Sequence, residues 1–502
     1  MSKKPNIVII MTDQQQARAA KREGFTLDTS PFIDSCAREG TWFDKAYTPA
    51  PLCAPARISM LTGRYTNAHG VRANPAFAQA SFDKDLIDVL KEAGYKTAMI
   101  GKNHSHLTKD RLDHWFSMGH PGGYNNHDIA WSDEEKAFDQ WIFDLSHGVA
   151  EEAAPFPLAC QGSYRMVSDA EKWISEADKD KSDKQDKPFF LWLSFAEPHN
   201  PYQVPEPYFS LFPIKDNPPV YGAEQSPAEK GFKWDFLYQL EHRAMPRYDE
   251  LLPRMRSNYY GMIRLIDDQI ERFTKVLKEK DLYEDTIFFF VSDHGDFAGD
   301  YGFMRKGPEM PESLMRIPFA VWGSGIQTCG APHKAHVNLV DIMPTLCDML
   351  DISIPAGVQG KSLRPILSGE PYPEEEFSCA YAEQGIGGLD YNWNDNPDFE
   401  KHSPYNITFD CLNQYSQCGT MRMVRKDDWK LVFDMQGNGW MYNLHEDPAE
   451  LCNLYNLPEF SETQNNLLQE LLKQTLRAQD SLPLGGNKYE LKRHPKNYWS
   501  ET

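Results

Sequence analysis

Long hydrophobic runs are missing from this sequence of 502 residues. No stretch approaches the roughly eighteen consecutive apolar residues that a membrane-spanning helix needs. The first apolar run, residues 7–11, is also shorter than the apolar core of a secretory signal peptide, which spans about 7–15 residues. We therefore expect no membrane partner and a cytoplasmic location, or a periplasmic or secreted one if a leader has been trimmed from this sequence.

Cysteine is also scarce, and positive charge is in the minority. The nine cysteines are thinly spread, their number is odd and none forms a CxxC pair, which predicts reduced thiols rather than a disulfide framework. Lysine and arginine total 52 against 73 aspartates and glutamates, which gives a net charge of −21. An acidic chain without a long basic run is not expected to bind nucleic acid or a membrane surface.

The residues that are present indicate a folded chain of two domains. The length exceeds what one ordinary hydrophobic core supports, and 41% hydrophobic with 13% aromatic residues is typical of globular proteins. Near Gly369 the composition changes to prolines and glutamates, which predicts a linker. We therefore predict a large domain over residues 1–375 and a smaller one over 376–502, the second with short strands at 421–426, 429–433 and 439–443 and a helix at 464–478.

Several apolar runs end abruptly at polar residues, a pattern typical of buried parallel strands. Between them, apolar residues that recur at intervals of three and four predict helices. These two periodicities indicate an α/β fold with a central sheet. The expected strands are 6–11, 95–100, 188–195 and 286–291, and the expected helices are 31–40, 85–93 and 254–280, with residues 205–253 wrapping the surface.

The region 108–185 fits this pattern least well. It is rich in histidine, tryptophan, glycine and aspartate, and only residues 167–177 predict a helix. We expect an insertion that shapes a substrate pocket. In and near it, His106, His120 and His127 are either in contact with the substrate or ordinary loop histidines.

Side chains suited to binding and proton transfer follow all four strands, and the carboxyl ends of parallel strands lie at one edge of a sheet. They are Asp13 and Gln14, Lys102 and His104, His199, and Asp293 and His294. Oxygen atoms of the first and last pairs suit a hard divalent cation such as Ca²⁺, although an imidazole is softer than Ca²⁺ normally prefers. Each set taken alone is also consistent with a polar turn, a solvated lysine or a capping histidine.

The most informative stretch is residues 52–64, LCAPARISMLTGR. Prolines before and after Cys53 stiffen the chain there, and the residues from Ala56 onward predict a helix that Gly63 ends. Cys53 would then lie near a helix N-terminus, where backbone N–H groups favour an anion, with Arg57 one turn away. Without its flanking residues, the cysteine would be interpreted as a buried structural thiol.

This stretch resembles the Cys-x-Pro-x-Arg…Thr-Gly-Arg element of the type I sulfatases, a family of the alkaline-phosphatase-like superfamily. The order Asp-Gln, Cys-x-Pro-x-Arg, Lys-x-His, His, Asp-His and Lys is similar to that family over nearly the whole chain, with Lys306 as the final lysine. The resemblance implies an alkaline-phosphatase-like α/β fold, with a mostly parallel central sheet flanked by helices and a smaller C-terminal antiparallel-sheet domain. It also implies one divalent cation, Ca²⁺ with Mg²⁺ or Mn²⁺ as alternatives, bound by Asp13, Gln14, Cys53, Asp293 and His294.

The resemblance further implies a sulfuric ester hydrolase whose nucleophile is made after synthesis. A formylglycine-generating maturase would oxidise Cys53 to formylglycine, and a hydroxyl of the hydrated aldehyde would attack sulfur. By the same resemblance, Arg57, Lys102 and Lys306 would neutralise the sulfate oxygens. His199 would protonate the departing alcohol, and His104 would help to release sulfate.

Two other functions stay open at this point. Phosphonate monoester and phosphodiester hydrolases of the same superfamily resemble this chain in the Asp-Gln pair, the Asp-His pair and the modified cysteine. They usually lack Lys-x-His, so Lys102 and His104 favour sulfate. The third interpretation is a non-catalytic binding homologue, although every expected polar position is filled.

The sequence leaves the alcohol of the substrate open between a sulfated sugar, an aryl or steroid sulfate and choline sulfate. We predict a small sulfated molecule and exo action, because an acidic chain repels a sulfated polymer at distances shorter than the screening length. The polar tail from Asn487, with Tyr498 and Trp499, is expected to fold back or to pack on a second subunit of a homo-oligomer.

Overall fold

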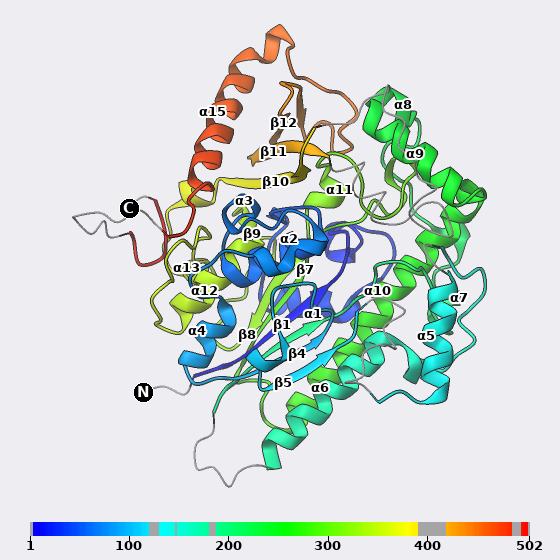
Figure 1. Ribbon diagram of the computed structural model, residues 1–502, viewed down its shortest axis with the longest axis vertical. Coiled ribbons are helices and arrows are strands. Elements are labelled where there is room, and N and C mark those ends of the chain that lie inside the picture. The colour runs from blue at the N-terminus through cyan, green and yellow to red at the C-terminus, as the bar shows by residue number, and fades with distance from the viewer. Residues whose placement is uncertain are drawn as a thin grey trace.

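A seven-stranded sheet forms the centre of the molecule (Figure 1). The computed structural model describes residues 4–119, 130–145, 148–179, 187–389, 418–483 and 493–499. In spatial order the strands are β2 (Thr41–Trp42), β8 (Phe319–Gly323), β7 (Thr286–Ser292), β1 (Asn6–Thr12), β6 (Phe189–Ser194), β4 (Lys96–Gly101) and β5 (His114–Ser117). Strand β8 runs antiparallel to both of its neighbours, and the other pairs are parallel. The predicted mostly parallel sheet is confirmed.

The inner strands are apolar on both faces. Every residue of β1, β6 and β7 is buried, as expected for parallel strands that are covered from two sides. In β1, Ile7, Ile9 and Met11 belong to the apolar cluster on one face, and Val8 and Ile10 to the cluster on the other. Because both sides are apolar, each face of the sheet needs a cover.

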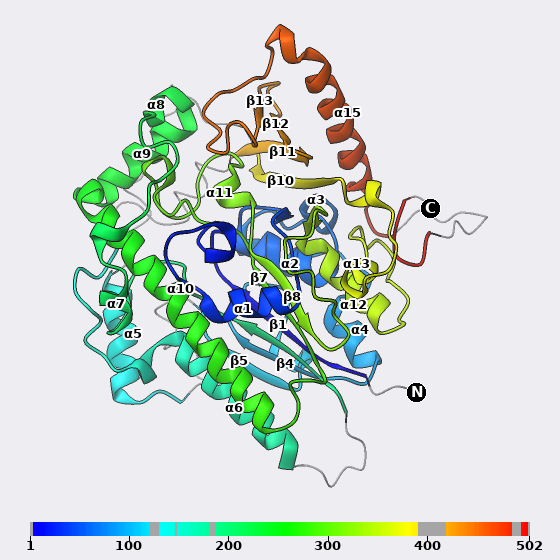
Figure 2. The ribbon, with the colours of Figure 1, turned by 180° about the vertical axis from the view of Figure 1, so that it is seen from behind.

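Helices cover both faces of the sheet (Figures 1 and 2). One apolar cluster joins the sheet to α2 (Cys53–Thr62), α4 (Leu86–Glu92), α12 (Ile342–Met349) and α13 (Arg364–Ser368). The other joins it to α1 (Pro31–Glu39), α6 (Gly162–Lys179) and α10 (Tyr248–Glu279), which lie in front of the sheet in Figure 2. Among the described residues, every helix is too short or too polar to cross a lipid bilayer.

A smaller antiparallel sheet follows the central one in the chain. It consists of β10 (Cys379–Gly387), β11 (Gly419–Lys426), β12 (Trp429–Asp434) and β13 (Gly439–Asn443). Helix α15 (Ser461–Arg477) packs on one face, and on the other face Met421 and Met423 pack with Tyr47 of β3 (Ala46–Tyr47). The predicted C-terminal sheet is confirmed, although the sequence analysis missed β10. The domain boundary at residue 375 stays a prediction.

The C-terminal residues 493–499 fold back onto the chain. Tyr498 is buried, and its hydroxyl donates to the Ser362 carbonyl at 2.8 Å. The backbone N–H of Trp499 donates to the Glu376 carboxylate at 3.0 Å. The described tail therefore adopts the first of its two expected placements, and a second subunit stays a prediction.

Residues 108–185 contain more regular structure than the sequence analysis predicted. Besides α6, the described part has the edge strand β5 and the helix α5 (Asp133–Leu145). Strand β5 is short and only half-buried, so it lacks the apolar run by which the other strands were found. The ring of His106 lies 2.6 Å from the Asp85 carboxylate at the start of α4, which is a structural contact. His120 and His127 lie outside the described residues.

The segment expected to wrap the surface is also more helical than predicted. It contains α7 (Tyr208–Leu211), α8 (Pro227–Lys230) and α9 (Phe232–Ala244), and α10 begins at Tyr248 rather than at Arg254. Pro253 lies inside α10. Proline usually ends or kinks a helix, but here the helix continues through it.

Asp267 of α10 makes folding stability dependent on pH. Its carboxylate is 2% exposed and accepts the backbone N–H groups of Phe32 and Ile33 at 2.9 Å each. Burial raises its pKa from 3.8 to about 7. Between those values the folded protein binds the proton and the unfolded chain does not. The free energy of unfolding therefore falls as pH rises from about 4 to 7, and the whole decrease is about 4 kcal/mol.

We expect Asp267→Asn to remove this pH dependence. The melting temperature of the variant should rise relative to that of the wild type as pH increases through this window. At every pH the variant also loses a constant amount of stability, because its amide has one acceptor oxygen fewer than the carboxylate. Thermal unfolding of both proteins at a series of pH values measures the difference. A difference that stays flat, or that falls as pH rises, would contradict the assignment.

Candidate active site

The ends of three strands and the start of one helix meet at one edge of the central sheet. Asp13 follows β1, Lys102 follows β4 and Asp293 follows β7, while α2 begins at Cys53. Each of these four residues is at most 1% exposed. The edge therefore collects charged side chains in a space that bulk water barely reaches.

The sequence around Cys53 forms the helix start that its residues predict. Leu52 is extended, Cys53 is the first residue of α2, and Gly63 ends the helix with a φ of 64°, in the left-handed region that favours glycine. The N–H of Ala54 lies in the first turn and has no partner within the helix, and it donates to Asn74 Oδ1 at 3.1 Å. Cys53 Sγ thus lies at the positive end of a buried helix.

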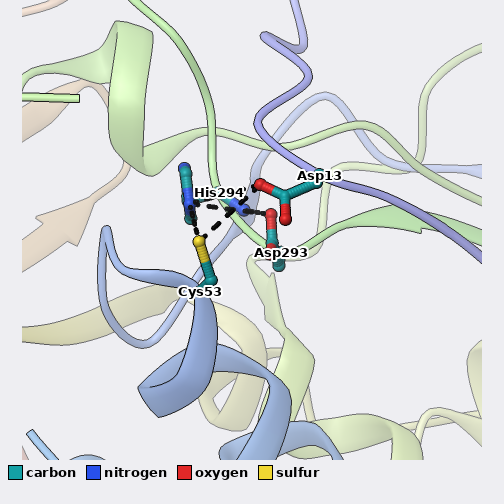
Figure 3. A group of neighbouring side chains, drawn as sticks. All are labelled: Asp13, Cys53, Asp293 and His294. Carbon is teal, nitrogen blue, oxygen red and sulfur yellow. Dashed lines mark hydrogen bonds and ion pairs between the residues drawn. The ribbon is translucent and has the colours of Figure 1, made fainter. Parts of the chain in front are cut away.

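Two carboxylates and an imidazole surround the thiol (Figure 3). One ligand atom from each of Asp13, Cys53, Asp293 and His294 lies within 4.8 Å of all the others. Sγ is 3.3 Å from His294 Nε2 and 3.7 Å from Asp13 Oδ1. His294 Nδ1 lies 2.8 Å from the Gly295 carbonyl, which can only accept, so Nδ1 carries a proton and Nε2 faces the cluster. Burial lowers the pKa of this imidazole, but Asp293 and Cys53 outweigh burial and raise that pKa.

Two lysines add positive charge to this cluster. Lys306 Nζ is 3.4 Å from Cys53 Sγ, and Lys102 Nζ is 3.8 Å from Sγ and pairs with Asp13. Burial and Asp13 raise the pKa of the Cys53 thiol, but Lys102, Lys306 and His294 outweigh them and lower it below its usual value. Burial likewise raises the pKa of Asp13, while Lys102 and weaker neighbours hold it well below its usual range. The site thus favours negative charge at position 53.

Arg57 connects the strand ends to each other. Its Nε donates to Asp293 at 2.8 Å and one Nη donates to Asp13 at 3.2 Å. The other Nη donates to the Lys102 carbonyl at 2.8 Å and to Ser194 Oγ at 2.7 Å. The guanidinium thus holds both carboxylates in place, and Ser194, which the sequence analysis did not select, anchors it.

Gln14 is oriented by a residue that the sequence analysis also did not select. Gln14 Nε2 donates to Asp296 Oδ2 at 2.6 Å, and the other oxygen of Asp296 accepts the N–H groups of Ala298 and Arg305. A carboxylate cannot donate, so the amide oxygen of Gln14 must face the other way, where Lys306 Nζ lies at 3.3 Å. The backbone of Gln14 has a φ of 69°, a strained conformation for this residue type.

Comparison with known proteins decides the family of this chain. Residues 5–352 match the family model described as Sulfatase. The chain belongs to the sulfatase family. An arylsulfatase of Clostridium perfringens is 31% identical over 98% of this chain and 98% of its own. An N-acetylglucosamine-6-O-sulfatase of Bacteroides thetaiotaomicron is 24% identical over 96% of this chain and 88% of its own. This sulfatase is a sulfuric ester hydrolase, as predicted.

Solved structures share its fold. A phosphonate monoester hydrolase of Agrobacterium radiobacter has a TM-score of 0.73 at 21% identity and covers 95% of the sulfatase and 96% of its own chain. A protein solved in complex with its substrate, D-glucosamine-2-N,6-O-disulfate, has a TM-score of 0.69 at 21% identity, with 96% and 99% covered. At such identities the likeness shows the alkaline-phosphatase-like fold alone.

The two remaining predicted residues, His104 and His199, are less buried than the cluster around Cys53. His104 is half-buried in the loop after β4, with a φ of 39°. His199 is half-buried in the loop after β6, and its Nδ1 lies 2.8 Å from the Asn200 carbonyl. His199 is one of the groups that lower the pKa of Asp13, after the larger effect of Lys102. The imidazole of His199 is therefore near the site and also lines a neighbouring cavity.

Proposed function

We propose that this sulfatase releases inorganic sulfate from a small sulfated molecule, with formylglycine at position 53 as the nucleophile and one divalent cation. The observation that carries the proposal is the position of Cys53 at the start of α2. Its Sγ lies 3.3 Å from His294, 3.4 Å from Lys306 and 3.8 Å from Lys102. An anionic sulfate group at this position would be bound by the ammonium groups of Lys102 and Lys306.

The donor set beside Cys53 fits a hard divalent cation. Asp13, Asp293 and the amide oxygen of Gln14 would supply oxygen ligands, His294 would supply Nε2, and position 53 would complete the set. When bound, such an ion supplies Lewis-acid charge to a sulfate oxygen. Ca²⁺ is the first candidate because oxygen donors predominate, and Mg²⁺ and Mn²⁺ are the alternatives.

Each protein side chain then has a separate role. Lys102 and Lys306, whose ammonium groups both lie close to position 53, neutralise the sulfate oxygens. Arg57, whose nitrogens all donate to protein groups, keeps Asp13 and Asp293 in place. His199 transfers a proton to the departing alcohol, and His104 assists the hydroxyl that expels sulfate.

The relatives support sulfate over phosphonate. The curated relatives include the arylsulfatase at 31% identity, whereas the phosphonate monoester hydrolase is similar in fold only. Lys102 and His104 also form the Lys-x-His pair that favours sulfate. The excess of acidic residues, with a net charge of −21, favours a small sulfated molecule over a sulfated polymer.

Sulfate release tests the proposed function. Cys53 is 1% exposed in the folded protein, so the sulfatase should be co-expressed with a formylglycine-generating maturase. Inorganic sulfate is then measured by ion chromatography after incubation with sugar monosulfates and with 4-nitrophenyl sulfate. We expect turnover of at least one of these esters. No release of sulfate from any of them, by protein with confirmed formylglycine, would contradict the proposal.

Removal of divalent cations is expected to lower kcat by about 10²-fold or more, because the sulfate would lose its strongest positive neighbour. The check is turnover after dialysis against a chelator, followed by addition of Ca²⁺, Mg²⁺ or Mn²⁺. Asp293→Asn, which weakens one ligand, should raise the cation concentration needed for recovery. Full activity in protein shown by elemental analysis to be metal-free would exclude the cation from the site.

A further inference from the structure

A cavity of about 240 Å³ is bordered by the loops that follow β5 and β6, at the same edge of the sheet as Cys53. Its walls come from the loop after β5, from α5, from the start of α6 and from the loop after β6. Polar and aromatic side chains share these walls, among them Trp131, Phe138, Arg165, Glu197, His199 and Asn200.

The loop after β6 connects this cavity to the cluster around Cys53. The backbone N–H of Asp13 donates to the Glu197 carbonyl at 3.1 Å. Two residues further on, His199 lines the cavity and acts electrostatically on Asp13. The proposed proton donor for the leaving alcohol therefore belongs to both spaces, and the alcohol of an ester bound at position 53 has this cavity beside it.

Three side chains on the cavity walls carry buried polar atoms that have no hydrogen-bond partner among the residues that the structure describes. Asn200 is 2% exposed, and neither atom of its amide is paired within the described chain. One oxygen of Glu197 accepts the Ser163 N–H at 3.3 Å, and the other, like the indole N–H of Trp131, is buried and unpaired within the same residues. Burying such groups costs free energy, so their presence on one cavity indicates a ligand with donors and acceptors.

We propose that this cavity binds the alcohol part of the substrate and that the alcohol is a single sugar ring with free hydroxyl groups. The inference rests on the proposed function and names its substrate class. A sugar hydroxyl both donates and accepts, which matches the amide of Asn200, the carboxylate of Glu197 and the N–H of Trp131. The volume is below the roughly 300–1,000 Å³ of pockets for drug-sized ligands, which suits a single ring.

Two competing alcohols match the walls less well. An aryl group without hydroxyls would leave the three polar groups buried and unpaired, and a site built for hydrogen bonds rejects an analogue that lacks them. A quaternary ammonium such as choline is recognised by open aromatic faces. Here the guanidinium of Arg165 lies over the Trp131 ring at 4.2 Å, so this aromatic face is already covered. Glu135 holds Arg165 in that position at 2.8 Å.

The test compares two variants on two classes of ester. Asn200→Leu removes the amide, and Trp131→Phe removes the N–H donor while keeping an aromatic ring. We expect each to lower kcat/KM for hexose monosulfates roughly 10- to 100-fold more than for 4-nitrophenyl sulfate. Asn338→Leu is the matched control. Asn338 is 3% exposed, but its amide is bonded to Tyr381 and Val340, so its loss should lower the melting temperature and leave the ratio of the two substrates unchanged.

The possible results separate this inference from the proposed function. Equal losses on both ester classes, or turnover of 4-nitrophenyl sulfate or choline sulfate but of no hexose monosulfate, would overturn the sugar pocket and leave the sulfatase activity in place. Absence of sulfate release from every ester by matured wild type would overturn both. A selective loss on the sugar esters in both variants would support the pocket, since a folding defect affects both substrates alike.

Discussion

Cys53→Ala is expected to lower kcat/KM for every sulfate ester by about 10⁴-fold or more, because it removes the proposed nucleophile. The fold should persist, since the substitution removes one buried sulfur and leaves the backbone of α2 unchanged. Mass spectrometry of the peptide that contains Cys53 should show an aldehyde in the matured wild type. Steady-state turnover and thermal unfolding of the variant complete the measurement.

Cys347 offers a matched control for this experiment. It is a buried free cysteine of α12, but burial raises the pKa of its thiol to about 12, whereas the charges around Cys53 lower the pKa of that thiol. Cys347→Ala should cost stability and keep the activity. If Cys53→Ala retained activity, position 53 would not be the nucleophile, and the proposed mechanism would have to be abandoned.

His199→Gln is expected to lower kcat about 10²- to 10⁴-fold for alkyl sulfates, which need a proton on the departing oxygen. 4-Nitrophenyl sulfate leaves as a stable phenolate, so its rate should fall less than about tenfold. The position of His199 between the cluster and the neighbouring cavity gives the physical reason. The readout is kcat for a series of esters ordered by the pKa of the alcohol.

His106→Gln is the control for His199. Its ring lies 2.6 Å from Asp85 at the start of α4, so a change there should affect all esters equally and only through stability. Equal losses across the ester series in His199→Gln would show that His199 binds the sulfate group instead of protonating the alcohol.

The positions at the sheet edge were predictable because of the way parallel strands end. Asp13 and Asp293 each follow an apolar run, and buried parallel strands bring such residues to one edge. Cys53 at a helix start and Gly63 at its end were predictable from local rules that act independently of the rest of the chain. Proline restricts the backbone, alanine favours a helix, and glycine tolerates the left-handed conformation that ends one.

The partners of these residues were not predictable from the sequence. Ser194, at the end of β6, accepts a hydrogen bond from Arg57 of α2. Its position beside Arg57 depends on how β4 and β6 pair. Asn200 becomes notable only when its amide is seen to be buried within the cavity wall. Strand β5 carries half-exposed residues at the sheet edge, so it lacks the continuous apolar run that identifies a central strand.

The fold does not separate sulfate from phosphate chemistry, because a phosphonate monoester hydrolase superimposes on the chain with a TM-score of 0.73. The distinction rests on Lys102 and His104 after β4 and on the sulfatase relatives. The most direct measurement is the ratio of kcat/KM for 4-nitrophenyl sulfate to that for bis(4-nitrophenyl) phosphate, with the same matured and metal-loaded protein. We expect the ratio to favour the sulfate ester, and Lys102→Ala to reduce it. Faster hydrolysis of the phosphodiester would contradict the assignment to sulfate.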